Sequence, residues 1–228
     1  NLDIDNDFGE TGNDRVEIVG DNDSTNIFGS SVNDVINGGL GGDNLTGGAG
    51  NDVFDFDAVL ESQAADADLS NLDAIQDLNL GDDGSGPAPV DTLDLSGIGG
   101  TGVTSVLDGV SANLSEASLR TDLNTAFTGG GTAGSTQAQI ITDDASDADL
   151  SGREFLVFDN DDNDDNGTIN GSDLHVEITG FNGTLDAGDF IAGGTTPNPN
   201  PNPNPNPGTG DTQAPTVAAG QTLTFTEN

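Results

Sequence analysis

Aspartates recur at a nearly constant interval in the first quarter of this 228-residue chain. The steps between them are nine, nine, eleven, nine and nine residues, and the positions are Asp5, Asp14, Asp23, Asp34, Asp43 and Asp52. Two positions after the last five stand Val16, Thr25, Ile36, Leu45 and Phe54, which we expect to point inward. A unit this short cannot bury an apolar face alone, so the chain has to stack its units into one continuous core.

Two adjacent units, Gly38–Thr46 and Gly47–Asp55, match the nonapeptide G-G-x-G-x-D-x-U-x at every specified position, where U is a large apolar residue. Upstream, Gly9–Glu17 lacks only the second glycine, and Gly29–Asn37 keeps the first glycine, the aspartate and the apolar position. Glycines permit a tight turn over the first six residues, and the last three make a short strand. A flexible Gly/Asp-rich linker is the alternative, but the regular phase of the apolar positions disfavours it.

These repeats resemble those of the repeats-in-toxin (RTX) family. The resemblance implies a fold that is mainly all-β, in the form of a parallel β-roll. Its turns would alternate between two edges of the roll, so ions would bind between every second turn. Carbonyl and carboxylate oxygens suit calcium, which takes six to eight oxygen ligands, better than magnesium, which requires rigid octahedral geometry.

The resemblance also implies the ligands of several calcium ions. One site would combine Ser30, Val32 and Asp34 with Gly47, Ala49 and Asp52. A site at the opposite edge would combine Asp23 with Gly38, Leu40 and Asp43. A further site would pair Asp14 with Asp34.

The charge balance points to cations as partners. The chain has 41 acidic residues against three arginines, for a formal net charge of -38. Without counter-ions such a composition favours disorder and opposes compaction. The high negative charge also excludes nucleic acid as a partner. No apolar run approaches the ~18 residues of a membrane span, so we expect no membrane insertion. The absence of cysteine excludes disulfides and thiolate zinc sites.

A second metal loop is predicted downstream. Residues 162–173 read D-x-D-x-N-G-x-I-x-x-x-D and resemble the twelve-residue calcium loop of EF-hands and dockerins. The predicted ligands are Asp162, Asp164, Asn166, Thr168, Asn170 and Asp173. Residues 154–159 and 174–179 read as strands, so we expect the loop to join two strands; a solvated acidic hairpin is the alternative. We expect His175 to be structural or exposed rather than a ligand.

The chain divides into four stretches. Residues 1–57 form the nonapeptide roll, and residues 58–194 continue it with strands, the predicted calcium loop and one helix that begins after Ser115. Residues 195–211 repeat Pro-Asn, which predicts an extended linker. Residues 212–228 return to strand-like alternation, as the first strand of an immunoglobulin- or cadherin-like domain or as an exchanged strand.

No catalytic constellation is visible, so we expect no enzymatic activity from this chain. The leading hypothesis is a calcium-stabilised structural module of a secreted bacterial surface protein, such as an S-layer component, a sheath filament or an adhesin. It would be exported by type I secretion and would fold on binding calcium at the extracellular surface. Its partners would be calcium, further copies or other surface components. One alternative is the calcium-folding tail of a secreted protease or lipase. Another is a fibre subunit that assembles by exchange of residues 221–227.

Overall fold

Strands dominate the structure, a computed structural model that describes residues 16–81, 90–98, 103–129, 136–145, 150–159 and 173–191. In chain order the strands are β1 (Val16–Val19), β2 (Asn26–Ser30), β3 (Asp34–Asn37), β4 (Asn44–Gly48), β5 (Val53–Asp55), β6 (Asp73–Ile75), β7 (Thr92–Asp94), β8 (Ser105–Val106), β9 (Val110–Ala112), β10 (Gln137–Asp143), β11 (Glu154–Asp159), β12 (Leu174–Glu177) and β13 (Phe190–Ile191). One α-helix, α1 (Leu119–Ala126), and short 3-10 helices at Val59–Glu61, Ser96–Ile98, Glu116–Ser118 and Ala187–Asp189 complete the described part.

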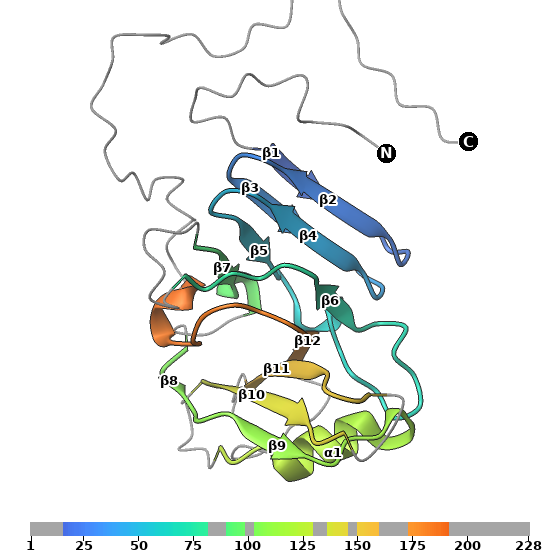
Figure 1. The fold of residues 1–228 in the computed structure, drawn as a ribbon. Coiled ribbons are helices and arrows are strands. Elements are labelled where there is room, and N and C mark those ends of the chain that lie inside the picture. The colour runs from blue at the N-terminus through green and yellow to red at the C-terminus, as the bar shows by residue number, and fades with distance from the viewer. Residues whose placement is uncertain are drawn as a thin grey trace, which may run out of the picture. The chain divides into compact units, whose positions relative to one another are not determined.

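Successive strands of the N-terminal half alternate between two sheets. The first sheet has the order β1-β3-β5-β7-β13, and the second has the order β2-β4-β6-β12-β11-β10-β8, with β9 also paired to β10. All pairs from β1 to β7 are parallel, so the chain coils and each coil stacks on the previous one (Figure 1). The fold is therefore all-β with stacked parallel coils, as predicted.

A column of apolar side chains runs through the coils at a strict nine-residue interval: Ile18, Ile27, Ile36, Leu45 and Phe54. Parallel pairing places Ile18 beside Ile36 and Ile27 beside Leu45. We predicted that Val16 and Thr25 are the inward-pointing residues of the first two units. That alignment was wrong by two residues. Each isoleucine lies two positions beyond the expected residue, and aligning the isoleucines keeps the core column unbroken where Thr25 would have interrupted it.

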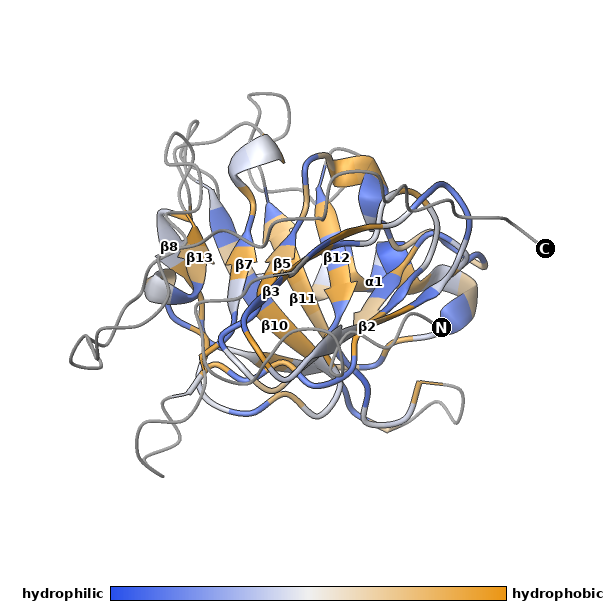
Figure 2. Cartoon of the chain, turned by 90° about the horizontal axis from the view of Figure 1, so that it is seen from above, coloured by the Kyte–Doolittle hydropathy of each residue, from blue (hydrophilic) through white to orange (hydrophobic). Residues whose placement is uncertain are grey.

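The main core lies between the two sheets. Ile36, Leu45, Phe54 and Leu93 are fully buried in it, and the same cluster continues into the C-terminal strands. Apolar residues accordingly run across the neighbouring strands β5, β7, β11 and β12 (Figure 2). Apolar residues further along the chain continue this core and are also buried: Ile75, Leu78, Leu80, Leu93 and Leu95.

A second core lies under the helix. Leu119, Leu123 and Phe127 pack with Phe155 and Val157 of β11. The helix does not begin directly after Ser115 as predicted, because residues 116–118 form a 3-10 turn first. Asp122 reaches back to accept hydrogen bonds from the Ser115 amide at 3.0 Å and from the Ser118 hydroxyl at 2.7 Å, so this carboxylate caps the turn.

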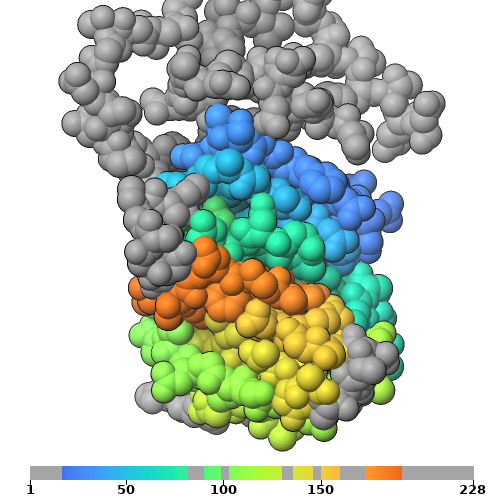
Figure 3. Space-filling model, viewed as in Figure 1, coloured from blue at the N-terminus to red at the C-terminus, as the bar shows by residue number. Residues whose placement is uncertain are grey.

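The two halves of the described chain thus differ in construction. Bands of successive coils run from β1 and β2 at one end to β9 and α1 at the other (Figure 3). Within the described residues, no helix is both long enough and apolar enough to span a bilayer. The predicted linker at residues 195–211 and the predicted strand at residues 212–228 lie outside the described residues and stay predictions.

Candidate metal centres

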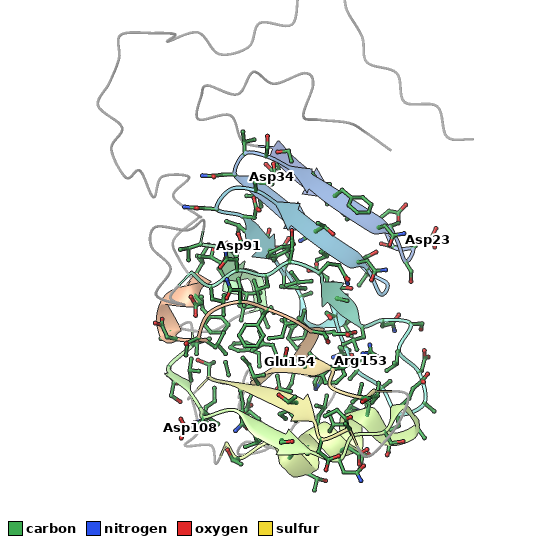
Figure 4. The ribbon with its side chains drawn as sticks, in the orientation of Figure 1. Asp23, Asp34, Asp91, Asp108, Arg153 and Glu154 are labelled. Atoms are coloured by element: carbon green, nitrogen blue, oxygen red, sulfur yellow. The ribbon has the colours of Figure 1, made fainter. Side chains whose placement is uncertain are left out.

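Two columns of aspartates run along the edges of the coil stack, where strands begin after a turn. The first aspartate column contains Asp34, Asp52 and Asp91, and the second contains Asp43 and Asp73 below Thr25. Asp34 and Asp91 lie at one edge, and Asp23 lies at the opposite edge (Figure 4). The columns follow from the parallel register, which brings equivalent residues of successive coils side by side.

Each column is held by hydrogen bonds from backbone to carboxylate. In the first column, the Asp34 amide donates to Oδ1 of Asp52 at 2.8 Å, and the Asp52 amide donates to Oδ1 of Asp91 at 3.0 Å. In the second, the Thr25 amide donates to Oδ1 of Asp43 at 2.7 Å, and the Asp43 amide donates to Oδ1 of Asp73 at 2.8 Å. One oxygen of each lower carboxylate is thereby used to fasten the coil above it.

The other carboxylate oxygens have no such partner. Oδ2 of Asp43, Asp52 and Asp73 is buried and has no hydrogen-bond partner among the described residues. Burial, the largest effect, raises the pKa of Asp52 to about 7 and that of Asp73 to about 8, with further increases from neighbouring carboxylates. A buried charged oxygen without a partner is unstable, so each of these groups requires a proton or a cation.

The first glycine of each nonapeptide makes room for that carboxylate. A Cβ on Gly38 would lie 2.8 Å from Oδ2 of Asp43, and a Cβ on Gly47 would lie 2.4 Å from Oδ2 of Asp52. Gly48 has a φ of +100°, and a Cβ there would also lie 2.1 Å from the Ser30 carbonyl oxygen. The turns therefore require glycine both for backbone conformation and because carbonyl and carboxylate oxygens crowd against them.

The structure brings the residues of the first predicted site together. The Ala49 amide donates to the Ser30 carbonyl at 3.0 Å, so the two turns are in contact. A Cβ on Gly29 would lie 2.2 Å from the Gly47 carbonyl oxygen and 2.6 Å from Oδ2 of Asp34, so these two oxygens flank one small space. The Val32 carbonyl lies in the same pair of turns, 2.7 Å from the Cβ position of Gly50. That these groups bind calcium stays a prediction.

The second predicted site needs a correction at Asp23. Pairing of Asn26 with Asn44 places Thr25, not Asp23, level with Asp43. Asp23 is exposed in the turn, where its amide donates to the Asp21 side chain at 2.9 Å. The cause is the same two-residue shift that places Ile27 in the core. Of the other predicted members, Leu40 donates its amide to the Asp21 carbonyl at 3.0 Å, and Gly38 lies against Gly20.

Asp14 lies outside the described residues, so its predicted pairing with Asp34 stays a prediction. Asp162, Asp164, Asn166, Thr168 and Asn170 of the predicted second loop also lie outside them. Asp173, the last predicted ligand of that loop, is buried at the start of β12. The flanking strands are present as predicted, because β11 and β12 pair antiparallel with Phe158 opposite Leu174.

Sequence reasoning missed Asp73, Asp77 and Asp91. Asp73 and Asp91 open the triplets Asp73-Ala74-Ile75 and Asp91-Thr92-Leu93, which repeat the D-x-U portion of the nonapeptide. That triplet was the available signal, but longer intervening segments hide it from a nine-residue count. Asp77 accepts hydrogen bonds from the amides of Gly47 at 2.9 Å and Gly48 at 2.8 Å, and so fixes the turn above it.

Side chains alone do not complete a metal site in the described part of the chain. No group of three or more His, Cys, Asp or Glu residues there is gathered closely enough to hold an ion. An ion at a column would therefore take many of its ligands from backbone carbonyls of the turns. His175 is fully buried in β12, as a structural residue would be, and neither ring nitrogen has a hydrogen-bond partner among the described residues.

The fold and the two aspartate columns together define an all-β coil with carboxylate-lined edges. No family model and no curated protein matches the chain. Among solved structures the chain is similar to the AlgE6R3 subunit of the Azotobacter vinelandii mannuronan C5-epimerase, at 18% identity and a TM-score of 0.37 over 91% of this chain and 95% of that one. A TM-score this low carries no conclusion about function.

Proposed function

We propose that this chain is a calcium-stabilised structural module of a secreted bacterial protein. The observation that carries the proposal is the set of buried carboxylate oxygens, Oδ2 of Asp43, Asp52 and Asp73, that no described donor satisfies. These groups stack at successive coils of a chain whose net charge is -38. A cation at each corner would neutralise them and would join each turn to the next.

Protein cations do not fill this role in the described residues. The ion pair found there joins Arg153 to Glu177 and leaves Oδ2 of Asp43, Asp52 and Asp73 without a partner. The neighbouring oxygens are carbonyls of the turns, such as those of Ser30, Val32 and Gly47. Hard oxygen donors in an irregular arrangement favour calcium over magnesium, which requires near-ideal octahedral geometry.

Ion binding of this kind is large enough to control folding. An ion that binds only the folded chain, at 100 times its dissociation constant, adds ~2.7 kcal/mol of stability. About four such sites would add roughly 10 kcal/mol, which is comparable to the whole stability of an ordinary domain. The chain would stay unfolded where calcium is scarce and would fold outside the cell, where calcium is abundant.

We assign the module to a surface protein such as an S-layer component, sheath filament or adhesin, because the Pro-Asn tract and another strand-like segment follow the roll in the sequence. The proposal requires no catalytic group.

Far-ultraviolet circular dichroism with exhaustive chelation tests the proposal. We expect β-sheet signal to fall in chelator, to return on adding calcium, and not to return on adding equimolar magnesium. Equilibrium dialysis should find several bound calcium ions per chain. A spectrum that stays unchanged after complete calcium removal, or dialysis that finds no bound ion, would refute the proposal.

A further inference from the structure

Among the described strands, the coil stack ends at β1 and β2. β1 is the last strand of the first sheet and β2 is the last strand of the second, and among the described strands each is paired on one side only. The opposite end of the molecule carries β9 and α1 (Figure 1). A long strand edge without a partner is a ready template for another strand.

Burial of the apolar column decreases toward this end. Ile36, Leu45 and Phe54 are 0% exposed, whereas Ile27 is 8% exposed and Ile18 is only partly buried. On the outer face, Val19 is 67% exposed and Phe28 is 58% exposed. A further strand on β2 would cover the open side of Ile27 in the core and would flank Phe28 on the outer face, whereas Val19 lies on β1 of the other sheet.

Side-chain amides on the outer face of the second sheet point in one direction. Nε2 of Gln76 in the β6 turn donates to Oδ1 of Asn44 in β4 at 3.3 Å, and Nδ2 of Asn44 donates to Oδ1 of Asn26 in β2 at 3.0 Å. No described residue accepts a hydrogen bond from Nδ2 of Asn26. The amide ladder thus ends at this edge with an exposed donor, which is available to an acceptor on an added strand.

The backbone of β2 offers the remaining contacts. The Thr25 amide and carbonyl both bond toward β4, the amide to the Asp43 side chain and the carbonyl to the Asn44 amide at 2.9 Å. Because successive residues of a strand alternate in direction, the amide and carbonyl groups of Asn26 and Phe28 point away from β4.

We propose that the edge of β2 accepts residues 221–227 of a second copy of this chain as an added parallel strand. Gln221–Glu227 alternates apolar Leu223 and Phe225 with three threonines. Placing Phe225 level with Ile27 directs it to the core, and Thr224 then lies level with Asn26. The Thr224 hydroxyl accepts the hydrogen bond from Nδ2 of Asn26, and the amide ladder gains its missing member.

Charge favours this segment over the residues that precede β1. The turn between β1 and β2 exposes Asp21 and Asp23, whereas residues 221–227 carry a single charge, on Glu227 at the end away from that turn. Residues 1–8 contain three aspartates, Asp3, Asp5 and Asp7, which the turn would repel. Paired residues of β2 and β4 are 18 positions apart in the sequence. The same separation would place Gly9 level with Ile27, and glycine has no side chain to fill the core position.

The sequence between the two partners supplies the reach. The alternating Pro-Asn stretch of residues 197–207 spans roughly 30 Å when extended, at ~3.1 Å per residue. The donor strand and the acceptor edge are different surfaces, so the contact is head-to-tail. Repetition of such a contact produces a filament when its rotation does not close a ring, and we propose the filament.

Cysteine cross-linking tests the pairing directly, since the native chain has no cysteine. One protein carries Asn26→Cys, the other carries Thr224→Cys, and the two are mixed in calcium and oxidised. We expect a disulfide-linked heterodimer, and at least tenfold less of it when Val217→Cys replaces Thr224→Cys. Equal yields from the two would overturn the proposal.

Two double variants test the competing occupants. Asn26→Cys with Thr224→Cys in one chain would cross-link within the monomer at high dilution if the chain covered its own edge. Asn26→Cys with Asp3→Cys would do so if the N-terminal residues covered it. Either intramolecular product as the main species would overturn the proposal.

Edge variants test assembly without touching the core. Phe28→Pro removes an outward amide that bonds to no described residue, whereas the matched Phe28→Thr keeps that amide. We expect filaments by electron microscopy for wild type and Phe28→Thr, and none for Phe28→Pro or for a chain ending at residue 220. Circular dichroism in calcium is recorded on the same samples, so loss of assembly is separated from loss of calcium-dependent folding. Filaments that persist in Phe28→Pro with native spectra would refute the strand pairing.

Discussion

Asp52→Asn separates the role of a carboxylate as an ion ligand from its role as a hydrogen-bond acceptor. The side chain keeps its shape, and its Oδ1 still accepts from the Asp34 amide, a contact of 2.8 Å in the native chain. What changes is Oδ2, the buried oxygen without a described partner, which becomes a neutral amide group. The variant therefore has opposite effects with and without calcium.

The magnitudes follow from burial and from ion linkage. Burial raises the pKa of Asp52 from 3.8 to about 7, so at pH 8 its charge destabilises the ion-free fold. At about 1.4 kcal/mol per pKa unit the destabilisation is at most ~4 kcal/mol, and an unsatisfied amide in the variant costs about 1–3 kcal/mol in return. The ion-free variant is thus more stable than wild type by about 1–3 kcal/mol, whereas at 1,000-fold calcium excess it lacks the ~4.1 kcal/mol of one site and is less stable than wild type by about 1–3 kcal/mol.

Urea unfolding at pH 8, followed by circular dichroism in chelator and in calcium, measures both effects. We expect Asp52→Asn to retain more β-sheet signal than wild type in chelator and to unfold at lower urea in calcium. Asp108→Asn, at an exposed position away from both columns (Figure 4), should match wild type in both conditions. If Asp52→Asn lost the same stability in chelator as in calcium, the carboxylate would act only as a hydrogen-bond acceptor and the ion-site reasoning would be wrong.

Three further predictions concern the turns and the buried titratable groups. Gly47→Ala would place a Cβ 2.4 Å from Oδ2 of Asp52 and should lower calcium affinity in a titration at least tenfold. Gly109→Ala is the control, because its Cβ would meet only one atom, at 3.6 Å, and it should leave calcium affinity unchanged. In chelator, the free energy of unfolding should rise as pH falls from about 8 toward 4. Burial raises the pKa of Asp73 to about 8, so in this range the carboxyl group is protonated in the folded chain but ionised in the unfolded chain. A constant urea midpoint over this range would contradict the prediction. His175 changes stability with pH in the opposite direction. Burial lowers its pKa from 6.5 to about 3, so its contribution to the free energy of unfolding is lost as pH falls from 6.5 toward 3. His175→Leu should reduce the acid sensitivity of unfolding in calcium below pH 6, and an unchanged profile would contradict this.

The aspartate interval was enough to predict stacked coils, but the apolar residues determine the phase. Around the eleven-residue step, two alignments compete, one matching Asp23 with Asp43 and one matching Ile27 with Leu45. The structure adopts the second, because a gap in the core column at Thr25 loses buried apolar contact, whereas Asp23 can remain in water. The spacing of the aspartates alone does not show which of the two alignments has the lower free energy.

Asp73 and Asp91 show a second limit of sequence reasoning. Each is separated from the preceding aspartate of its column by a long excursion, and the three-dimensional register brings it back to the same edge. A three-residue triplet is too short to be recognised without the repeat interval. The role of Asp122 was missed for a similar reason, since its capping contact with Ser115 spans seven residues and depends on the 3-10 turn between them.

The second aspartate column ends at a defined point. The Asp73 amide donates to the hydroxyl of Ser62 at 2.9 Å, and that hydroxyl donates in turn to the His175 carbonyl. Val176 stands level with Asp73 in the next strand, so an apolar residue replaces the carboxylate. Beyond this point the chain changes from coils with carboxylate-lined edges to a sheet with a helix and an apolar core of its own.

This change predicts that the two halves lose structure separately when calcium is removed. On the proposed function, the coils β1–β5 require a cation to neutralise their aspartates, whereas the second core consists of fully buried apolar residues: Leu119, Leu123, Ile141, Phe155 and Val157. Hydrogen exchange followed by mass spectrometry should therefore show amides of β1–β5 losing protection at higher residual calcium than amides of β10, β11 and α1. In saturating calcium both groups should be protected. Simultaneous loss of protection in both halves at every calcium concentration would show a single cooperative unit, because local unfolding of the coils would then cost as much as global unfolding.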